Sequence, residues 1–457
     1  MNTMRNITFL AAAACVALAS TALPASAQQS SSDEKALIAK GEYIARAGDC
    51  VACHTGPGGK PFAGGLALHS AVGTIVSTNI TPDKQFGIGN YTEAQFSAAV
   101  RDGIRGDGAH LYPAMPYTAY AKVSDADIHA LYTYFMKAVE PVAAPTEPTA
   151  LIFPFNMRFG LGLWNKAFAG AGAFKPNPQA SAEINRGAYL VEGLGHCGSC
   201  HTPRGFAMQE EGMDASNAAF LTGGELEGWP VPSLRGPTKA TKGFASWTQA
   251  EIVDYLGTGR NAHAAVGGEM KPAVERSLAY LNDADLNAIA SYLKSIAQSG
   301  PTPPAVPEKV RATTDKLTAA KDLTLGERLY LDNCGACHFA GGQGAARVFP
   351  ALDGASIVNA DNPNGLIATI LGGAQTPSTD RSPSVLPMPG FGYRLTDKEV
   401  ASLATFLRSG WSNQAGPVSA DQVAAMRAKL PPQPVPGIQI EDKPAKGQTA
   451  EAVHASH

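Results

Sequence analysis

The sequence of 457 residues has few cysteines, little net charge and no long apolar run after its N-terminal segment. The formal net charge is −3, so the whole-chain balance points to neither a nucleic-acid partner nor an anionic lipid surface. A membrane-spanning helix needs roughly 20 apolar residues, and no later run reaches that length. The sequence also lacks a Gly-rich dinucleotide fingerprint and an acid–base pair, so no catalytic residue is predicted.

Six of the seven cysteines form three pairs with one spacing, and histidine follows each pair at once. This C-x-x-C-H pattern is typical of covalent haem attachment. Two thiols at this spacing can each form a thioether with a haem vinyl group, and the adjacent imidazole becomes the proximal iron ligand. The sequence therefore predicts three covalently bound haem c groups. Their attachment residues are Cys50, Cys53, Cys197, Cys200, Cys334 and Cys337, and their proximal ligands are His54, His201 and His338.

Other uses of paired cysteines fit this pattern less well. Structural zinc usually takes two C-x-x-C pairs for each ion, so three pairs leave one unmatched. A thioredoxin-like redox site needs a βαβ pattern, which is not visible. Disulfides give no reason for a histidine after every pair.

An electron-carrying haem usually has a second axial ligand, and methionine raises its reduction potential relative to histidine. One methionine lies at an equivalent place in each repeat, eight to twelve residues before the last helix cap. The predicted distal ligands are Met115, Met270 and Met388. His263 competes with Met270 in the same loop, and His110 competes more faintly with Met115. That alternative stays open for the second haem.

A metal-bound histidine usually donates its second ring nitrogen to a fixed acceptor. Pro232 and Pro350 fall where a proline carbonyl can accept this hydrogen bond from His201 and His338. The first repeat has no equivalent string. Residues 79–82 are the candidate stretch there, and the acceptor for His54 stays unassigned.

Helical patterns recur around each C-x-x-C-H string. A short helical stretch precedes each string, with the first haem cysteine eight to ten residues after its glycine, and two further helices follow the string. The last helix has a polar N-cap with an acid three residues on, then apolar residues at helical spacing. Three copies of one domain, all-α in fold, are therefore predicted. The glycines are Gly41, Gly187 and Gly326, and the caps are Ser124, Asn282 and Thr396.

Composition sets the expected boundaries. A positive residue, an apolar run and the string Ala25-Ser26-Ala27 predict a signal peptide over 1–27, with a lipoprotein signal at Cys15 as the weaker alternative. The protein is therefore expected in the periplasm. The three domains are expected at 28–140, 181–298 and 321–411. The other segments are a linker with an apolar loop at 141–180, a Pro-rich linker at 299–320 and a polar Pro-rich tail at 412–457.

The apolar loop runs from Leu151 through Phe155 to Trp164 and Phe168. Packing between domains is the simpler structural interpretation of this loop. Contact with the membrane interface or with a partner subunit is the other, because exposed apolar patches often mark interaction sites. Pro154 and the polar residues that follow it exclude a membrane span.

With these motifs in place, the chain resembles the triple-haem cytochrome c subunits of membrane-bound periplasmic dehydrogenases, such as alcohol, gluconate, sorbitol and fructose dehydrogenases. The similarity runs from about residue 35 to about residue 412. The strings that carry it are Gly41-Glu-Tyr-Ile-Ala-Arg, Ser77-Thr-Asn-Ile-Thr-Pro-Asp83, Tyr112-Pro-Ala-Met-Pro-Tyr117, Gly195-His-Cys-Gly-Ser-Cys-His-Thr-Pro-Arg-Gly205 and Leu386-Pro-Met-Pro-Gly-Phe391.

The resemblance implies three tandem class I-type cytochrome c domains and a role in electron transfer. It implies a catalytic partner subunit with pyrroloquinoline quinone or FAD, a small third subunit in some complexes, and ubiquinone as the acceptor. It also implies peripheral attachment to the periplasmic face of the cytoplasmic membrane. Two alternatives remain open: a cytochrome subunit of a molybdenum hydroxylase or aldehyde dehydrogenase, and a multihaem peroxidase. A peroxidase needs a vacant or displaceable distal position, and three candidate methionines argue against one.

Overall fold

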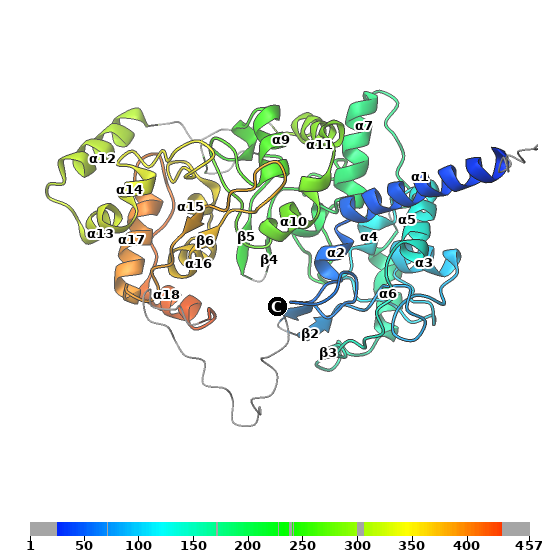
Figure 1. Ribbon diagram of the computed structural model, residues 1–457. Coiled ribbons are helices and arrows are strands. Elements are labelled where there is room, and N and C mark those ends of the chain that lie inside the picture. Colours follow the sequence, from blue (N-terminus) through cyan, green and yellow to red (C-terminus); the bar gives the residue numbers. More distant parts are fainter. Residues whose placement is uncertain are drawn as a thin grey trace, which may run out of the picture.

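The structure, a computed structural model, describes residues 25–70, 72–170, 172–226, 228–236, 240, 242–298 and 306–431. Residues 1–24 of the predicted signal peptide and residues 432–457 of the predicted tail lie outside the described residues. The described chain is mostly helical, with 44% helix and 8% strand, in agreement with the predicted dominance of helices. Figure 1 shows the first repeat in blue and cyan, the second in green beside it, and the third in yellow and orange on the far side.

Each repeat has the same order of long helices around its C-x-x-C-H string. The elements from the N-terminus to the second repeat are α1 (Ala25–Ala47), α2 (Cys50–Cys53), β1 (Ala67–Ser70), β2 (Gly73–Val76), α3 (Glu93–Asp102), α4 (Tyr117–Tyr120), α5 (Asp125–Lys137), β3 (Ala150–Leu151) and α6 (Phe159–Phe168). Those of the second repeat are α7 (Ala182–Tyr189), the π-helix η1 (Leu190–Leu194), α8 (Gly198–His201), β4 (Gly224–Leu226), β5 (Trp229–Val231), η2 (Phe244–Ser246), α9 (Gln249–Thr258), α10 (Met270–Arg276), η3 (Leu278–Tyr280) and α11 (Asp283–Ser295). The remaining elements are α12 (Pro307–Ala319), α13 (Leu325–Asn333), α14 (Gly335–His338), α15 (Ser356–Asn359), α16 (Asn364–Gly372), β6 (Ala374–Gln375), β7 (Pro387–Met388), α17 (Asp397–Ser409) and α18 (Ala420–Arg427).

The first and last helices of each repeat cross at the glycine that the sequence repeats. These pairs are α1 with α5, α7 with α11, and α13 with α17. A Cβ on Gly187 would overlap the carbonyl oxygen of Ala288, and the same holds for Gly41 against Ala130 and Gly326 against Ser402. Only glycine lets the two backbones approach this closely. The recurrent glycine therefore fixes the helix crossing beside each haem-attachment string.

The predicted caps begin the last helix of each repeat. The side chains of Ser124, Asn282 and Thr396 each accept a hydrogen bond from the backbone N–H three residues on. The Thr396–Glu399 copy forms the full reciprocal capping box. The middle helices α3, α9 and α16 end, as predicted, before glycines with positive φ.

The strands are short and antiparallel, and they fold the loops that follow the C-x-x-C-H strings. Strand β1 pairs with β2 in the register Leu68 to Ile75, and β2 then pairs with β3 through Gly73 and Leu151. The two-stranded ribbons β4–β5 and β6–β7 occupy the second and third repeats. Strand β3 thereby ties the start of the 141–180 segment to the first repeat.

The first two repeats share one hydrophobic core, whereas the third has its own. The shared core includes Ile44 and Phe135 from the first repeat and Ile252 and Leu286 from the second. The separate core is built around Tyr330 and neighbouring residues of α13, α16 and α17.

A reciprocal pair of hydrogen bonds joins the first two repeats. The hydroxyl of Tyr43 donates to Asp285 at 2.6 Å, and the hydroxyl of Tyr189 donates to Asp127 at 2.6 Å. Each tyrosine also accepts from the backbone N–H of the partner helix's N-cap residue. The third repeat has Arg328 where the others have tyrosine. The third repeat therefore lacks the side chain that makes this pairing.

The structure departs from the expected linker and tail. Within 299–320, Pro307 begins α12, and Leu317 of this helix is buried in the third core. Within 412–457, a capping box at Ser419 begins α18, and Val423 is fully buried against the same core. Apolar residues at helical spacing anchor both segments, so their proline-rich flanks misled the interpretation from composition. The 141–180 segment likewise contains helix α6.

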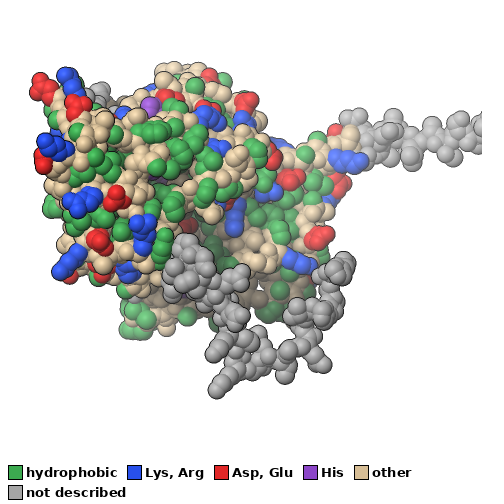
Figure 2. All heavy atoms as spheres, turned by 60° about the vertical axis from the view of Figure 1, so that its left-hand side comes forward, with side chains coloured by type: hydrophobic (Ala, Val, Ile, Leu, Met, Phe, Trp, Pro, Cys, Tyr) green, Lys and Arg blue, Asp and Glu red, His purple; other side chains and the backbone are tan. Residues whose placement is uncertain are grey.

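Among the described residues, no helix combines the length and apolar character that crossing a membrane requires. On the face shown in Figure 2, basic and acidic side chains are interspersed rather than gathered by sign. This mixture agrees with the small net charge of the chain.

Candidate haem sites

Each C-x-x-C-H string forms a single helical turn, which holds its two thiols and its histidine in a fixed relation. Helix α2 begins at Cys50 and ends at Cys53, and His54 follows it directly. Cys197 and Cys334 are the N-cap residues of α8 and α14, and the second cysteine and the histidine lie within those turns. The structure thus brings together the predicted attachment residues and proximal histidine of each site on one local element.

All three histidines of these strings have one ring nitrogen held by a backbone carbonyl. Nδ1 of His201 lies 2.8 Å from the oxygen of Pro232, and Nδ1 of His338 lies 2.9 Å from that of Pro350, as predicted. Nδ1 of His54 lies 2.7 Å from the oxygen of Thr78, the acceptor that sequence reasoning did not assign. A carbonyl can only accept, so Nδ1 carries the proton and Nε2 keeps its lone pair for iron.

Burial also favours the neutral form of the three histidines. It lowers the pKa of all three, and the hydrogen bond to the carbonyl opposes this only in part. The imidazoles are therefore neutral near pH 7, as an iron ligand must be.

The six thiols are not arranged as redox or zinc sites. None of them is joined in a disulfide within the described chain, and no cluster of three or more His, Cys, Asp or Glu side chains occurs there that could hold a metal ion. Burial raises the pKa of Cys50, Cys197 and Cys334 to about 12. These thiols therefore lack the lowered pKa that is typical of reactive cysteines.

The three predicted methionines lie in different local structures. Met115 is in the turn before α4 and packs against the shared core. Met270 is the first residue of α10, and Met388 lies in β7, paired with Ala374 of β6. All three are half-buried.

The two competing histidines are engaged elsewhere. Nε2 of His263 lies 2.8 Å from a carboxylate oxygen of Glu251, and its ring stacks on Trp247. His110 lies against α6, with Nδ1 3.4 Å from the amide nitrogen of Asn165. These contacts favour Met270 and Met115 as distal ligands.

One cavity of about 1110 Å³ serves both the second and the third site. It is lined by both C-x-x-C-H strings and is mainly apolar. Ligand pockets are usually about 300–1,000 Å³, so this space is slightly larger than that range. Because both C-x-x-C-H strings line it, the residues present fit two haems that share one space. The site residues that line it are Cys197, Cys200, His201, Met270, Cys334, Cys337, His338 and Met388.

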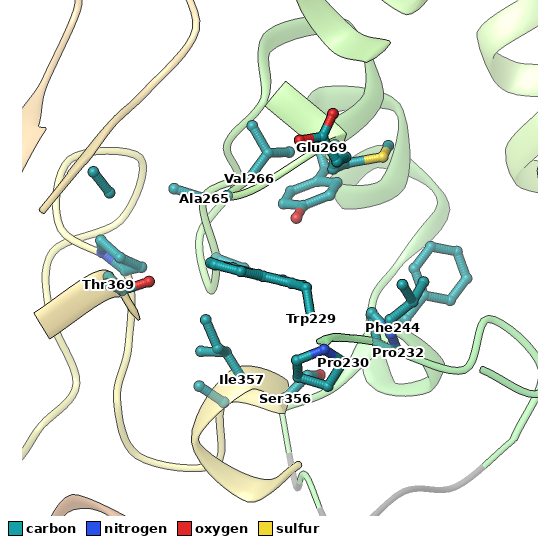
Figure 3. A pocket seen from close by; sticks show the side chains of 18 of the residues that line it. Trp229, Pro230, Pro232, Phe244, Ala265, Val266, Glu269, Ser356, Ile357 and Thr369 are labelled. Carbon is teal, nitrogen blue, oxygen red and sulfur yellow. The ribbon is translucent and has the colours of Figure 1, made fainter. Parts of the chain in front are cut away.

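Trp229 projects into this cavity between the two repeats, a position that sequence reasoning missed. Figure 3 shows it between Ala265 and Val266 of the second repeat and Ile357 and Thr369 of the third. Glycines at 268 and 365 leave room for its ring on either side, because a Cβ at either would press on the indole. The only sequence signal was an isolated Gly-Trp-Pro string.

Main-chain hydrogen bonds connect the second site's distal loop to the third site's proximal loop. The N–H of Ala351 donates to the carbonyl of His263 at 2.9 Å, and that of Arg347 donates to Asn261 at 3.0 Å. Pro350, between the two donors, holds His338. His263 thus positions the loop of the neighbouring site through its backbone.

Comparison with known proteins agrees with this geometry. A family model described as cytochrome c matches residues 184–297 and 323–411, and one described as cytochrome c oxidase, cbb3-type, subunit III matches residues 36–135. Cytochrome c domains of this kind imply covalently bound haem c.

Three similar proteins match over most of their length. The cytochrome c subunit of alcohol dehydrogenase (quinone) from Gluconacetobacter polyoxogenes is 44% identical over 92% of this chain and 89% of its own. The gluconate 2-dehydrogenase cytochrome c subunit of Pantoea cypripedii is 42% identical over 86% and 90%. The fructose dehydrogenase cytochrome subunit of Gluconobacter japonicus is 41% identical over 89% and 84%. This chain belongs to the family of cytochrome c subunits of alcohol, gluconate and fructose dehydrogenases.

Proposed function

We propose that this chain is the electron-transfer subunit of a periplasm-facing dehydrogenase complex. In this proposal it folds as three tandem cytochrome c domains with three haem c groups. It receives electrons from a catalytic subunit that contains pyrroloquinoline quinone or FAD, with a small third subunit in some complexes, and passes them to ubiquinone. The observation that carries the proposal is the threefold recurrence of a one-turn C-x-x-C-H helix whose histidine is held through Nδ1.

Two roles fall to the chain's own residues at each site. The paired cysteines would anchor the haem, and Nε2 of the histidine would ligate its iron. Met115, Met270 and Met388 are proposed as the second protein ligand of each haem. Bound in this way, haem c supplies reversible one-electron transfer, and a methionine ligand keeps its potential high.

The shared cavity supports direct transfer between the second and third haems. Both sites open into the same mainly apolar space, and low polarity reduces the reorganisation that accompanies a change of charge. The shared core and the Tyr–Asp pairs hold the first site against the second. This packing supports a relay through neighbouring sites.

Purification from membranes tests the proposal directly. The chain is expected to co-purify with a catalytic subunit whose cofactor can be identified by its absorbance. Recovery of the chain alone, with a high-spin haem in the oxidised state, would instead favour the peroxidase alternative. A co-purifying molybdenum protein would favour the hydroxylase alternative.

A further inference from the structure

Apolar side chains in the 141–180 segment point away from the protein. Phe153 is 74% exposed, and Phe159 and Leu163 are each 72% exposed. Phe206, in a loop of the second repeat, is 95% exposed. We call the following residues the apolar patch: Ile152, Phe153, Phe155, Phe159, Leu163, Phe206 and Met208.

Helix α6 is apolar on both its inward and its outward face, with Trp164 and Phe168 half-buried and Phe159 and Leu163 exposed. Its inward face includes Asn165, which accepts a hydrogen bond from the hydroxyl of Tyr117 at 2.7 Å and donates to the carbonyl of Asp102. Its outward face carries Phe159 and Leu163, one turn apart. A surface helix normally buries its apolar stripe and exposes its polar one. Phe159 and Leu163 depart from this rule and present apolar side chains to an external partner, beside the exposed Lys166.

The patch crosses from one repeat to the next as a single surface. The indole N–H of Trp164 donates to the carbonyl of Ala207 at 2.8 Å, and the rings of Phe168 and Phe206 meet edge to face. These contacts fix the 206–208 loop beside α6. Packing between the repeats, one of the two interpretations of this segment, therefore applies to Trp164 and Phe168 but leaves the apolar patch uncovered. In Figure 1, β3 and α6 lie together at the lower edge of the first repeat.

The charge of the 148–182 segment differs from the balance of the whole chain, whereas Glu210 and Glu211 follow the 206–208 part of the patch. Between Glu147 and Glu183 the sequence has no acidic residue, while Arg158, Lys166 and Lys175 are basic. Lys166 is exposed on α6 itself. Protruding aromatic and leucine side chains with basic neighbours are typical of segments that lie in the bilayer interface and attract anionic lipid.

We propose that the apolar patch seats this protein on an anionic lipid bilayer, with α6 lying in the interface plane. The inference rests on the proposed function, because a membrane-dissolved quinone acceptor requires the cytochrome to sit at the bilayer surface. It adds which residues make the contact. The occupant of the patch is lipid rather than a protein subunit.

Flotation of the purified haem-loaded protein with vesicles tests the inference. Vesicles contain either phosphatidylcholine alone or phosphatidylcholine with phosphatidylglycerol. The variant Phe159→Ser/Leu163→Ser is compared with Leu325→Ser/Val385→Ser, which replaces two exposed apolar side chains of the third repeat. The wild type is expected to float with anionic vesicles, the patch variant to partition roughly tenfold less, and the control to behave as wild type. The variant Lys166→Glu should reduce the preference for anionic vesicles.

Three outcomes would overturn the inference. The wild type could fail to float, or the patch variant could float as well as the control. The patch variant could also keep vesicle binding but lose its catalytic subunit on purification, which would make the patch a protein interface. Reduction of the detergent-dissolved haem protein by quinol analogues tests the electron-transfer function separately, so failure of either proposal can be recognised alone.

Discussion

Two side chains compete for the second iron, and their contacts predict which one binds. His263 already uses Nε2 with Glu251, whereas Met270 lines the cavity that the second and third sites share. Met270→Ala should therefore leave one reduced haem open to carbon monoxide, while His263→Ala should not. Met208→Ala, at an exposed methionine, is the matched control. A carbon monoxide difference spectrum that changes in His263→Ala but not in Met270→Ala would reverse the assignment.

A buried ion pair between repeats is expected to carry more stability than an exposed one. Lys122 lies 2.8 Å from Glu192, and both side chains are at least nine-tenths buried. Lys122→Met leaves the carboxylate without its cation, so the free energy of unfolding should fall by about 3–5 kcal/mol. Lys137→Met, in the exposed pair with Glu34, should cost less than about 1 kcal/mol. Equal costs in urea unfolding would contradict this account.

At the level of elements, the reciprocal Tyr–Asp pairs hold helix α1 to α11 and helix α7 to α5. Tyr43→Phe or Tyr189→Phe removes a donor from a largely buried carboxylate, which should lower the free energy of unfolding by about 1–3 kcal/mol. Tyr393→Phe, at an exposed tyrosine, should change it little. Thermal unfolding of the haem-loaded protein measures the difference, and indistinguishable midpoints would argue against the pairing.

The same pairs predict an acid dependence. Burial alone would raise the pKa of Asp127 and Asp285, but hydrogen bonds from Lys40 and Tyr189, and from Arg186 and Tyr43, outweigh it and lower both pKa values below 3.8. A lowered carboxyl pKa stabilises the fold above the unfolded value, and that stability is lost as pH falls. Unfolding midpoints followed from about pH 5 to about pH 2.5 should drop less in Asp127→Asn/Asp285→Asn than in wild type. Parallel curves would contradict the prediction.

Local elements could be predicted from the sequence where a short string determines them. The caps at Ser124, Asn282 and Thr396 and the carbonyl acceptors at Pro232 and Pro350 depend on neighbouring residues, and the structure confirms them. The acceptor for His54 was missed because it is the backbone oxygen of Thr78, which no recognisable string marks. Helices α12 and α18 were missed because proline-rich composition masked their few anchoring apolar residues.

At the scale of the molecule, relations between repeats were beyond the sequence. The glycines of the three repeats indicated a shared domain, but not that the first two repeats form one core while the third has a core of its own. The cavity shared by the second and third sites depends on Trp229 meeting α16 across 135 residues of chain or more. Such contacts join segments with no common pattern, so composition and spacing carry no trace of them.

The central claim is that one chain carries three electrons on three haems. A reductive titration of the purified haem-loaded protein, followed in the visible haem bands under nitrogen, tests it most directly. The account predicts that full reduction consumes three electrons for each chain and that a ubiquinone analogue then removes them. Saturation at fewer than three electrons would contradict it.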